Sequence, residues 1–385
     1  MRYVQLDSLR GLAACSVVLC HAGNVLPGVY DHPDRLWWLT ETPLAMLRSG
    51  HAAVIFFFVL SGFVLVLPFL KGPVSYPSFL LRRIFRVWIP YATAMIVAVC
   101  CATWFYPSTV PGLSQWANHS ISFNPGLMLD HFLLVGSFAN GTYNPVVWSL
   151  VHEMRISLLF PLLALLLRLG TWWRVLVAAA TLSVASVVLE RLPFWSGSTD
   201  LPMTLHYAGL FVLGMVLARD MPKLRAHYSR FSFRTKALLW VLALVCYSHE
   251  TWIFPNSRLQ QVAPYRDGLV AVGVSLFIIF ALSPSRFATL LERKPFVFLG
   301  QISYSVFLFH AVILLSLVHS FFGKVPIGLL WAATGLLTLA IATLSYHLTE
   351  VPSIRLGKSF RLEPKVPNLQ PVALPESSKR TSRTR

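Results

Sequence analysis

The sequence predicts an all-α fold, a polytopic helical bundle in a membrane. Of its 385 residues, 56% are hydrophobic and only 12% are charged, and the mean hydropathy is +0.63. Soluble domains carry about a quarter charged residues, so this composition does not fit one large soluble core. Apolar stretches of membrane-spanning length follow one another along the chain, whereas a β-barrel would show short alternating segments.

About ten transmembrane helices are predicted, and an even number places both termini on the same side of the membrane. The first apolar stretch resembles a secretory signal, but many hydrophobic segments follow it, so we expect a retained helix. The predicted spans cover residues 8–25, 52–70, 88–106, 146–167, 174–190, 201–219, 236–253, 267–283, 299–320 and 327–349.

The distribution of charge orients the bundle. With a cytoplasmic N-terminus, 25 of the 32 Lys and Arg residues fall in inward regions, against six in outward segments and one, Arg155, within a span. This asymmetry follows the positive-inside rule and predicts that both termini are cytoplasmic. The net charge of +17 then reflects topology and contact with the membrane surface. No nucleic-acid partner is expected, because the basic residues are scattered over many short loops.

The chain is expected to form one integral membrane domain over residues 1–355 and a disordered, basic cytoplasmic tail over 356–385. The longest outward connection, about 107–145, is long enough to act as a lid or binding loop. It contains an apolar piece over 127–138 that is too short to cross and is expected to be interfacial or re-entrant. The five cysteines show no disulfide or metal pattern and the histidines lack metal-ligand spacing, so no metal is predicted.

The first span carries Arg10 and His21. Ionisable groups are costly inside a membrane helix, which makes both residues candidates for function. Their spacing of eleven residues is about three turns, so they share one helix face roughly 16 Å apart. Asp7 precedes Arg10 by three residues and is positioned to pair with it. The alternative is a signal peptide or first anchor with an incidental histidine.

Three arginines, Arg82, Arg83 and Arg86, stand at the inner mouth of the third span. At spacings of three and four residues they can share part of one helix face. Guanidinium groups bind phosphate oxygens bidentately, which suits a phosphorylated ligand that arrives from the cytoplasm. The alternative is ordinary anchoring at lipid headgroups.

Trp148 lies at the outer start of the fourth span, and Ser149 and Glu153 follow on one face. A carboxylate about seven residues into a span requires a partner or a function. His21 lies about 20 Å from the cytoplasmic side of a ~30 Å core and Glu153 about 10 Å from the outer side, nearly the same level. This arithmetic allows a contact between Glu153 and His21 that would fix the imidazole tautomer.

Further polar residues are expected to support the bundle. His310 lies near the middle of the ninth span, where a histidine most often serves as an interhelical hydrogen bonder. His51, Ser61 and Gly62 flank an apolar run that is expected to pack close to the first span, because small residues permit close approach.

Together these motifs resemble the acyltransferase 3 family of integral membrane acyltransferases, which includes bacterial O-acetyltransferases of cell-surface polysaccharides. The matching stretches, in chain order, are Leu6-Asp7-Ser8-Leu9-Arg10-Gly11 with His21, Phe57-Phe58-Val59-Leu60-Ser61-Gly62-Phe63, Arg82-Arg83-Ile84-Phe85-Arg86, Trp148-Ser149-Leu150-Val151-His152-Glu153, and Gly300-Gln301-Ile302-Ser303-Tyr304 ending at His310.

The resemblance implies an acyltransferase of the bacterial inner membrane, with acyl-CoA (usually acetyl-CoA) as donor and a carbohydrate hydroxyl as acceptor. Some family members carry an additional extracytoplasmic hydrolase-like domain, and any such partner of this chain is expected to be a separate protein. A transporter or flippase of a glycan precursor or small solute is the alternative, although no half-chain repeat typical of transporters is visible.

The resemblance also implies roles for individual residues. His21 is expected to act as general base or acyl carrier, oriented by Glu153, while Arg10 orders the donor entrance. The remaining residues are assigned by class. Arg82, Arg83 and Arg86 are expected to bind the phosphates of the donor. The residues expected to support the site or to lie on its acceptor side are Asp7, Ser61, Gly62, Trp148, Ser149, Ser303, Tyr304 and His310.

Overall fold

A computed structural model of the protein describes residues 3–28, 42–105, 108–118, 124–136, 138–192, 200–250 and 262–360. These ranges contain helices and no β-strand, which confirms the all-α fold. Seven helical stretches are long and apolar enough to cross a membrane. They are α4 (Tyr76–Phe105), α6 (Val147–Leu165), α7 (Trp172–Glu190), α8 (Asp200–Arg230), α10 (Ala263–Leu282), α12 (Lys294–Phe321) and α13 (Ile327–Ser345) with its continuation.

Three more helices coincide with the other predicted spans. They are α1 (Val4–Asn24), α3 (Gly50–Val66) and α9 (Phe233–Ser248). At 17 and 16 residues, α3 and α9 are shorter than the roughly 20 residues that cross a bilayer upright. The structure therefore supports a polytopic bundle, and the number of ten spans stays a prediction.

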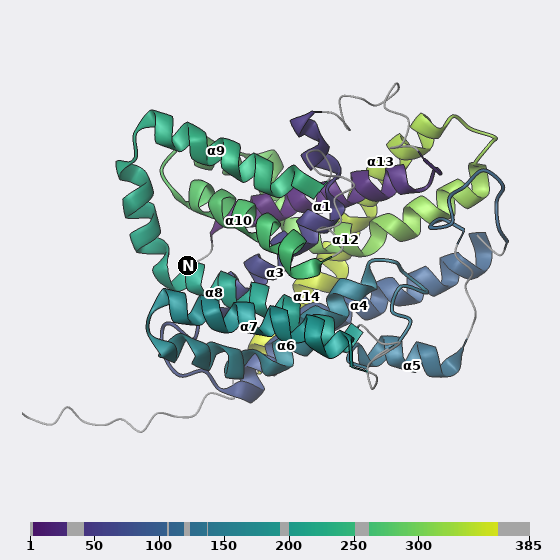
Figure 1. Ribbon diagram of the computed structural model, residues 1–385. Helices are drawn as coiled ribbons and strands as arrows, with labels where there is room; N and C mark the ends of the chain where they lie inside the picture. Colours follow the sequence, from purple (N-terminus) through teal and green to yellow (C-terminus); the bar gives the residue numbers. More distant parts are fainter. Residues whose placement is uncertain are drawn as a thin grey trace, which may run out of the picture.

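Two helices extend well beyond the apolar stretches that predicted them. Helix α4 begins at Tyr76 rather than at 88, and α8 ends at Arg230 rather than at 219. Hydropathy detects only the part of a helix that lies in lipid, whereas backbone hydrogen bonds continue past it. Pro222 lies inside α8, where a proline bends a helix, and the end of α8 runs across the end of the bundle before α9 returns (Figure 1).

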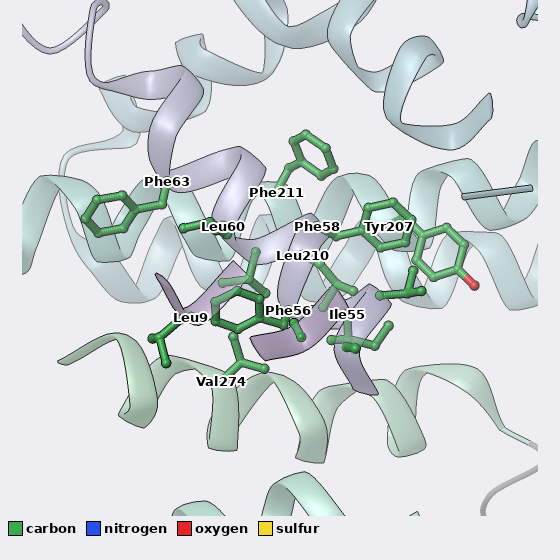
Figure 2. Close-up of a cluster of buried hydrophobic side chains, with 14 of the residues drawn as sticks. Leu9, Ile55, Phe56, Phe58, Leu60, Phe63, Tyr207, Leu210, Phe211 and Val274 are labelled. Atoms are coloured by element: carbon green, nitrogen blue, oxygen red, sulfur yellow. The ribbon is translucent and has the colours of Figure 1, made fainter. Parts of the chain in front are cut away.

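Helix α3 lies at the centre of the core. Figure 2 shows its side chains packed against α1, α8 and α10. Because α3 is apolar on nearly every face, it is buried among other helices rather than exposed to lipid on one side. The residues drawn there include Leu9 from α1, Phe56, Phe58 and Phe63 from α3, Tyr207 and Phe211 from α8, and Val274 from α10.

Close backbone contacts fix this core. A Cβ atom at Gly62 would overlap the Phe211 carbonyl of α8, and one at Gly214 of α8 would overlap the Val59 carbonyl of α3. The predicted close approach at Gly62 is thus present, but its partner is α8 and not the first span. The stretch as a whole does pack against the first span, as predicted, while Gly62 itself faces α8. Helix α3 meets α1 at Gly50, against Cys20.

The last helices turn back onto α4. After α13, a π-helical turn (η6, Tyr346–Glu350) leads into α14 (Val351–Ser359), which packs against α4. The short helix α5 (Pro125–Leu133) lies within the predicted 107–145 connection, of which residues 106–107, 119–123 and 137 are outside the described residues. The predicted tail lies outside them from residue 361 onward. Shorter elements are η1 (Pro43–Arg48), η2 (Leu166–Leu169) and α11 (Arg286–Leu291).

Candidate active site

Two cavities enter the bundle at different levels of α1. The first, which we call the basic cavity, has a volume of about 90 Å³ and is lined by Arg10 near the start of α1. The second, the aromatic cavity, has a volume of about 930 Å³ and is lined by Trp116, whose ring contacts His21 near the end of α1. Arg10 and His21 are eleven residues apart, roughly 16 Å along the helix.

The basic cavity brings together charges from four helical segments, α1, α4, α6 and η6. Arg10 of α1 forms the predicted ion pair with Asp7, since its Nη2 atom donates to Oδ1 of Asp7 at 2.9 Å. The Nε atom of Arg10 is buried and has no hydrogen-bond partner among the described residues, so a donor remains for a ligand. The other lining side chains with polar or charged groups are Ser61, Arg83, Arg86, Ser149, Glu153, Ser303, Tyr304 and Glu350.

Arg83 and Glu153 form an ion pair inside this cavity. The Nε atom of Arg83 also donates to Ser157 at 2.9 Å, and the Ser61 hydroxyl donates to Glu153 at 3.0 Å. The carboxylate predicted to orient His21 is thus engaged by Arg83, so that prediction was wrong. Depth arithmetic places two residues at one level of the membrane but does not say which faces of their helices meet.

The three predicted phosphate-binding arginines separate in the structure. Arg83 is held by Glu153, whereas Arg86 lines the cavity and forms no ion pair with the described residues. Arg82 is exposed, does not line the cavity and lies beside α14, where its Cα is 3.4 Å from a Cβ placed at Gly357. Arg82, one turn nearer the start of α4 than Arg86, therefore stands outside the cavity.

Glu350 completes the basic cavity and was missed from the sequence. Its Oε2 atom accepts a hydrogen bond from Ser305 at 3.2 Å, and it lines the same cavity as Arg86 and Arg10. It lies one residue beyond the predicted last span, at the end of the π-helical turn, a feature often found at functional sites. A carboxylate directly at the end of an apolar span was the signal available in the sequence.

Several predicted supporting residues also reach this cavity. Ser149 and Glu153 line it together, as their i,i+4 spacing predicts. The Tyr304 hydroxyl donates to the Val87 carbonyl at 2.8 Å and joins α12 to α4. Ser303, one residue earlier, donates to the Gly300 carbonyl at 2.9 Å within its own helix. These bonds fix the shape of the cavity wall.

His21 and His310 face each other between the two cavities. The distance between Nδ1 of His21 and Nε2 of His310 is 2.9 Å, so the predicted role of His310 as an interhelical hydrogen bonder is confirmed. Nδ1 of His310 lies 3.0 Å from the Val306 carbonyl oxygen, which only accepts, so this nitrogen carries the proton. In neutral His310, Nε2 then accepts a hydrogen bond from Nδ1–H of His21. The lone pair of the His21 ring is therefore on its Nε2 atom.

Ring contacts connect this histidine pair to both cavities. Phe307, which lines the basic cavity, has its ring centroid 6.1 Å from that of His310. On the other side, the ring of Trp116 lies 4.9 Å from that of His21 and lines the aromatic cavity. The histidine pair therefore lies between one wall residue of each cavity.

The aromatic cavity combines flat apolar faces with amide and hydroxyl groups. The indole of Trp148 forms part of its wall, as does the ring of Tyr207 from α8. Polar groups come mainly from the connection between α4 and α6. These are Gln115, Asn118, Asn140 and Thr142. Aromatic walls with a few polar groups are typical of binding sites for organic ligands.

A second polar cluster, not recognised in the sequence, lies next to Trp148. The buried carboxylate of Asp267 in α10 contacts Nε2 of His51 at 2.7 Å and Nε2 of His206 at 3.0 Å. The rings of His51 and Trp148 are parallel, with centroids 6.5 Å apart. No group of three or more metal-ligating side chains that could hold an ion occurs in the part of the chain that the structure describes.

Comparisons with known proteins agree with the motifs. A family model described as "Acyltransferase domain" matches residues 3–347. "Nodulation protein 10" of Rhizobium leguminosarum bv. viciae is 25% identical over 377 residues, which cover 92% of this chain and 94% of that protein. "O-acetyltransferase OatA" of Staphylococcus aureus (strain NCTC 8325 / PS 47) is 24% identical over 390 residues, 94% of this chain and 58% of that protein.

The chain spans about 57% of the length of the first staphylococcal relatives that it matches. No solved structure matches the chain.

Proposed function

Because the chain belongs to the acyltransferase 3 family, we propose that it moves an acyl group, expected to be acetyl, from acyl-CoA to a hydroxyl of a cell-surface or lipid-linked carbohydrate. The name of the staphylococcal relative, an O-acetyltransferase, supports transfer to oxygen. Family membership also argues against the alternative of a transporter or flippase. The protein is an integral membrane protein, and we propose the bacterial inner membrane as its location.

The basic cavity is the proposed entrance for the donor. Coenzyme A carries phosphates and a long, thin pantetheine arm that ends in the thioester. Arg86 forms no ion pair with the described residues, and Arg10 keeps a free buried Nε although its Nη2 is bonded to Asp7. Such charged donors bind phosphate oxygens well. The pantetheine arm would continue past Phe307 toward the histidine pair. The positive-inside asymmetry of the sequence places this entrance at the cytoplasm.

His21 is the proposed group through which the acyl unit passes. Its Nε2 lone pair is directed by the chain His21–His310–Val306 carbonyl, which fixes the tautomer as the carboxylate does in a catalytic triad. An imidazole can attack a thioester or remove a proton from a hydroxyl, and both reactions suit a neutral ring. The two roles differ in whether the acyl group becomes bound to the protein.

The aromatic cavity is the proposed acceptor site. Sugars present apolar faces that stack on indole rings and hydroxyls that bond to amides, and Trp116, Trp148 and Asn140 supply such groups. Its contact with His21 through Trp116 would bring an acceptor hydroxyl close to the acyl carbon.

The observation that carries this proposal is the His21–His310 pair between two chemically different cavities. The test uses purified protein in nanodiscs, radiolabelled acetyl-CoA and a panel of candidate glycans. We expect release of coenzyme A and a labelled acetyl ester with the wild-type protein, and neither with His21→Ala at unchanged thermal stability. Full turnover by His21→Ala would overturn the catalytic role of this residue.

A further inference from the structure

The cluster around Asp267 has the arrangement of a catalytic base and its orienting carboxylate. Asp267 is completely buried, whereas 23% of the His51 side chain is exposed. Oδ1 of Asp267 accepts from Nε2 of His51 at 2.7 Å, so Nε2 carries the proton and the lone pair of the neutral ring is on Nδ1. A buried acid that holds one nitrogen while the other stays accessible is the geometry in which histidine serves as a base.

The other groups that face Asp267 hold the carboxylate in place. Nε2 of His206 donates to Oδ2 at 3.0 Å, and Nδ1 of His206 lies 3.1 Å from the Ser183 hydroxyl. Nε of Arg266 donates to Oδ1 at 2.8 Å and lies 3.8 Å from Glu250. With both oxygens bonded, Asp267 stays ionised and oriented, and it is available to balance a positive charge on His51.

The position of His51 joins it to both cavities. On α3, residues 51, 54, 58 and 61 follow helical spacing on one face, and Val54, Phe58 and Ser61 line the basic cavity. His51 therefore continues that face one turn beyond the cavity lining. Its ring stacks on Trp148, a wall of the aromatic cavity.

The helix that carries His51 contacts the helix that carries His21 next to both histidines. Gly50 approaches the Cys20 side chain so closely that a Cβ at Gly50 would lie 2.9 Å from Cys20 Sγ. The residues that precede the two histidines thus touch each other. The two imidazoles are therefore carried by adjacent helices, each next to a residue of the contact, and each ring lies against a tryptophan of the aromatic cavity wall.

The partners of the two imidazoles differ in charge. His21 is bonded to a neutral imidazole, and among the described residues no carboxylate forms an ion pair with it. His51 is bonded to a carboxylate, which stabilises the imidazolium that forms when a base accepts a proton. We propose that His51 is the general base for the acceptor hydroxyl and that Asp267 is its positioning residue. The inference rests on the proposed function and assigns His21 the role of acyl carrier.

The chemistry divides into two balanced steps. First, Nε2 of His21 forms a bond to the acyl carbon, and the carbon–sulfur bond of the thioester breaks to release the coenzyme A thiolate. The His21 ring is then an N-acylimidazolium that keeps its Nδ1–H toward His310. Second, the acceptor hydroxyl gives its proton to Nδ1 of His51, and its oxygen forms the ester bond. The bond from the acyl carbon to Nε2 breaks and returns its electron pair to His21, and His51 later releases the proton to water.

The test uses the full-length protein in nanodiscs with radiolabelled acetyl-CoA, and ethanol and the more acidic 2,2,2-trifluoroethanol as acceptor probes. His51→Gln keeps an N–H donor for Asp267 but removes the base. We expect ester formation with ethanol to fall about 10²- to 10⁴-fold, the usual contribution of general-base catalysis. The loss should be smaller with trifluoroethanol, which needs less help to lose its proton, and free imidazole should restore part of the rate.

The protein itself should still be labelled in His51→Gln, because the first step needs only His21. Asp267→Asn is also expected to lower the ethanol rate, by up to about 10⁴-fold, the effect of the same change on the orienting aspartate of a catalytic triad. His227→Ala, an exposed histidine on α8, is the matched control and should behave as wild type.

Three results would overturn the proposal: unchanged ester formation in His51→Gln, an equal loss with both alcohols without imidazole rescue, or loss of protein labelling together with transfer. A wild-type protein that forms no ester and releases no coenzyme A with any acceptor would instead overturn the proposed function.

Discussion

Replacing His310 by Phe should slow the reaction at His21 without weakening donor binding. Phe keeps most of the ring volume but removes the Nε2 acceptor that lies 2.9 Å from Nδ1 of His21. When His21 takes up an acyl group or a proton its ring becomes positive, and the bond to His310 becomes charge-assisted. Such a bond contributes about 1.5–3 kcal/mol. At about 1.36 kcal/mol per factor of ten, kcat should fall roughly 10- to 160-fold.

The assay is release of coenzyme A thiol from acetyl-CoA by the purified protein, with kcat and KM measured separately. KM for acetyl-CoA should stay within about twofold, because His310 does not line the basic cavity. His310→Gln retains a side-chain acceptor and should recover part of the loss. His227→Ala is the matched control, since Nδ1 of His227 also bonds to the carbonyl four residues earlier but at the protein surface. A His310→Phe variant with wild-type kcat and normal thermal unfolding would refute the tautomer argument.

Three further predictions follow from the cavities, the helix contacts and α5. Arg86→Ala should raise KM for acetyl-CoA about tenfold or more, because a charged hydrogen bond contributes about 1.5–3 kcal/mol. Arg82 is exposed, so Arg82→Ala should change this KM less than about twofold. Equal effects of the two substitutions would contradict a specific role of Arg86 in donor binding. Gly62→Ala should force α3 and α8 apart and lower the unfolding temperature in detergent, while Gly335→Ala, with open space around it, should be neutral or slightly stabilising. Burial lowers the pKa of His131 to about 4, so its neutral form favours the fold above its ordinary pKa of 6.5, and this stability is lost as the pH falls toward 4. The loss should be about 2 kcal/mol at pH 5 relative to pH 8, and His131→Phe should unfold at a temperature that changes less between these two pH values.

Local features of the site were predictable from the sequence. The i,i+3 spacing of Asp7 and Arg10 gave the observed ion pair, because a helix fixes the positions of such neighbours whatever surrounds it. The partnered state of His310 was predictable because a polar group in a membrane helix needs a hydrogen bond. The all-α bundle followed from composition alone.

Contacts between distant helices were not predictable in the same way. The partner of Glu153 is Arg83 and the partner of Gly62 is α8, because both depend on how each helix is rotated about its axis. Asp267 was overlooked although it lies near the start of a predicted span, where a carboxylate signals a partner. That partner, His51, is 216 residues away, and no local pattern connects the two.

The basic cavity draws its charges from almost the whole length of the chain, from Asp7 and Arg10 in the first helix to Glu350 after the last long one. During synthesis, helices enter the membrane from the N-terminus onward. A nascent chain that stops short of the π-helical turn therefore lacks one wall of the basic cavity, the proposed donor entrance. Under this proposal an incomplete chain would not hydrolyse acyl-CoA. The cavity would be complete only after Glu350 has been synthesised and has packed against the earlier helices.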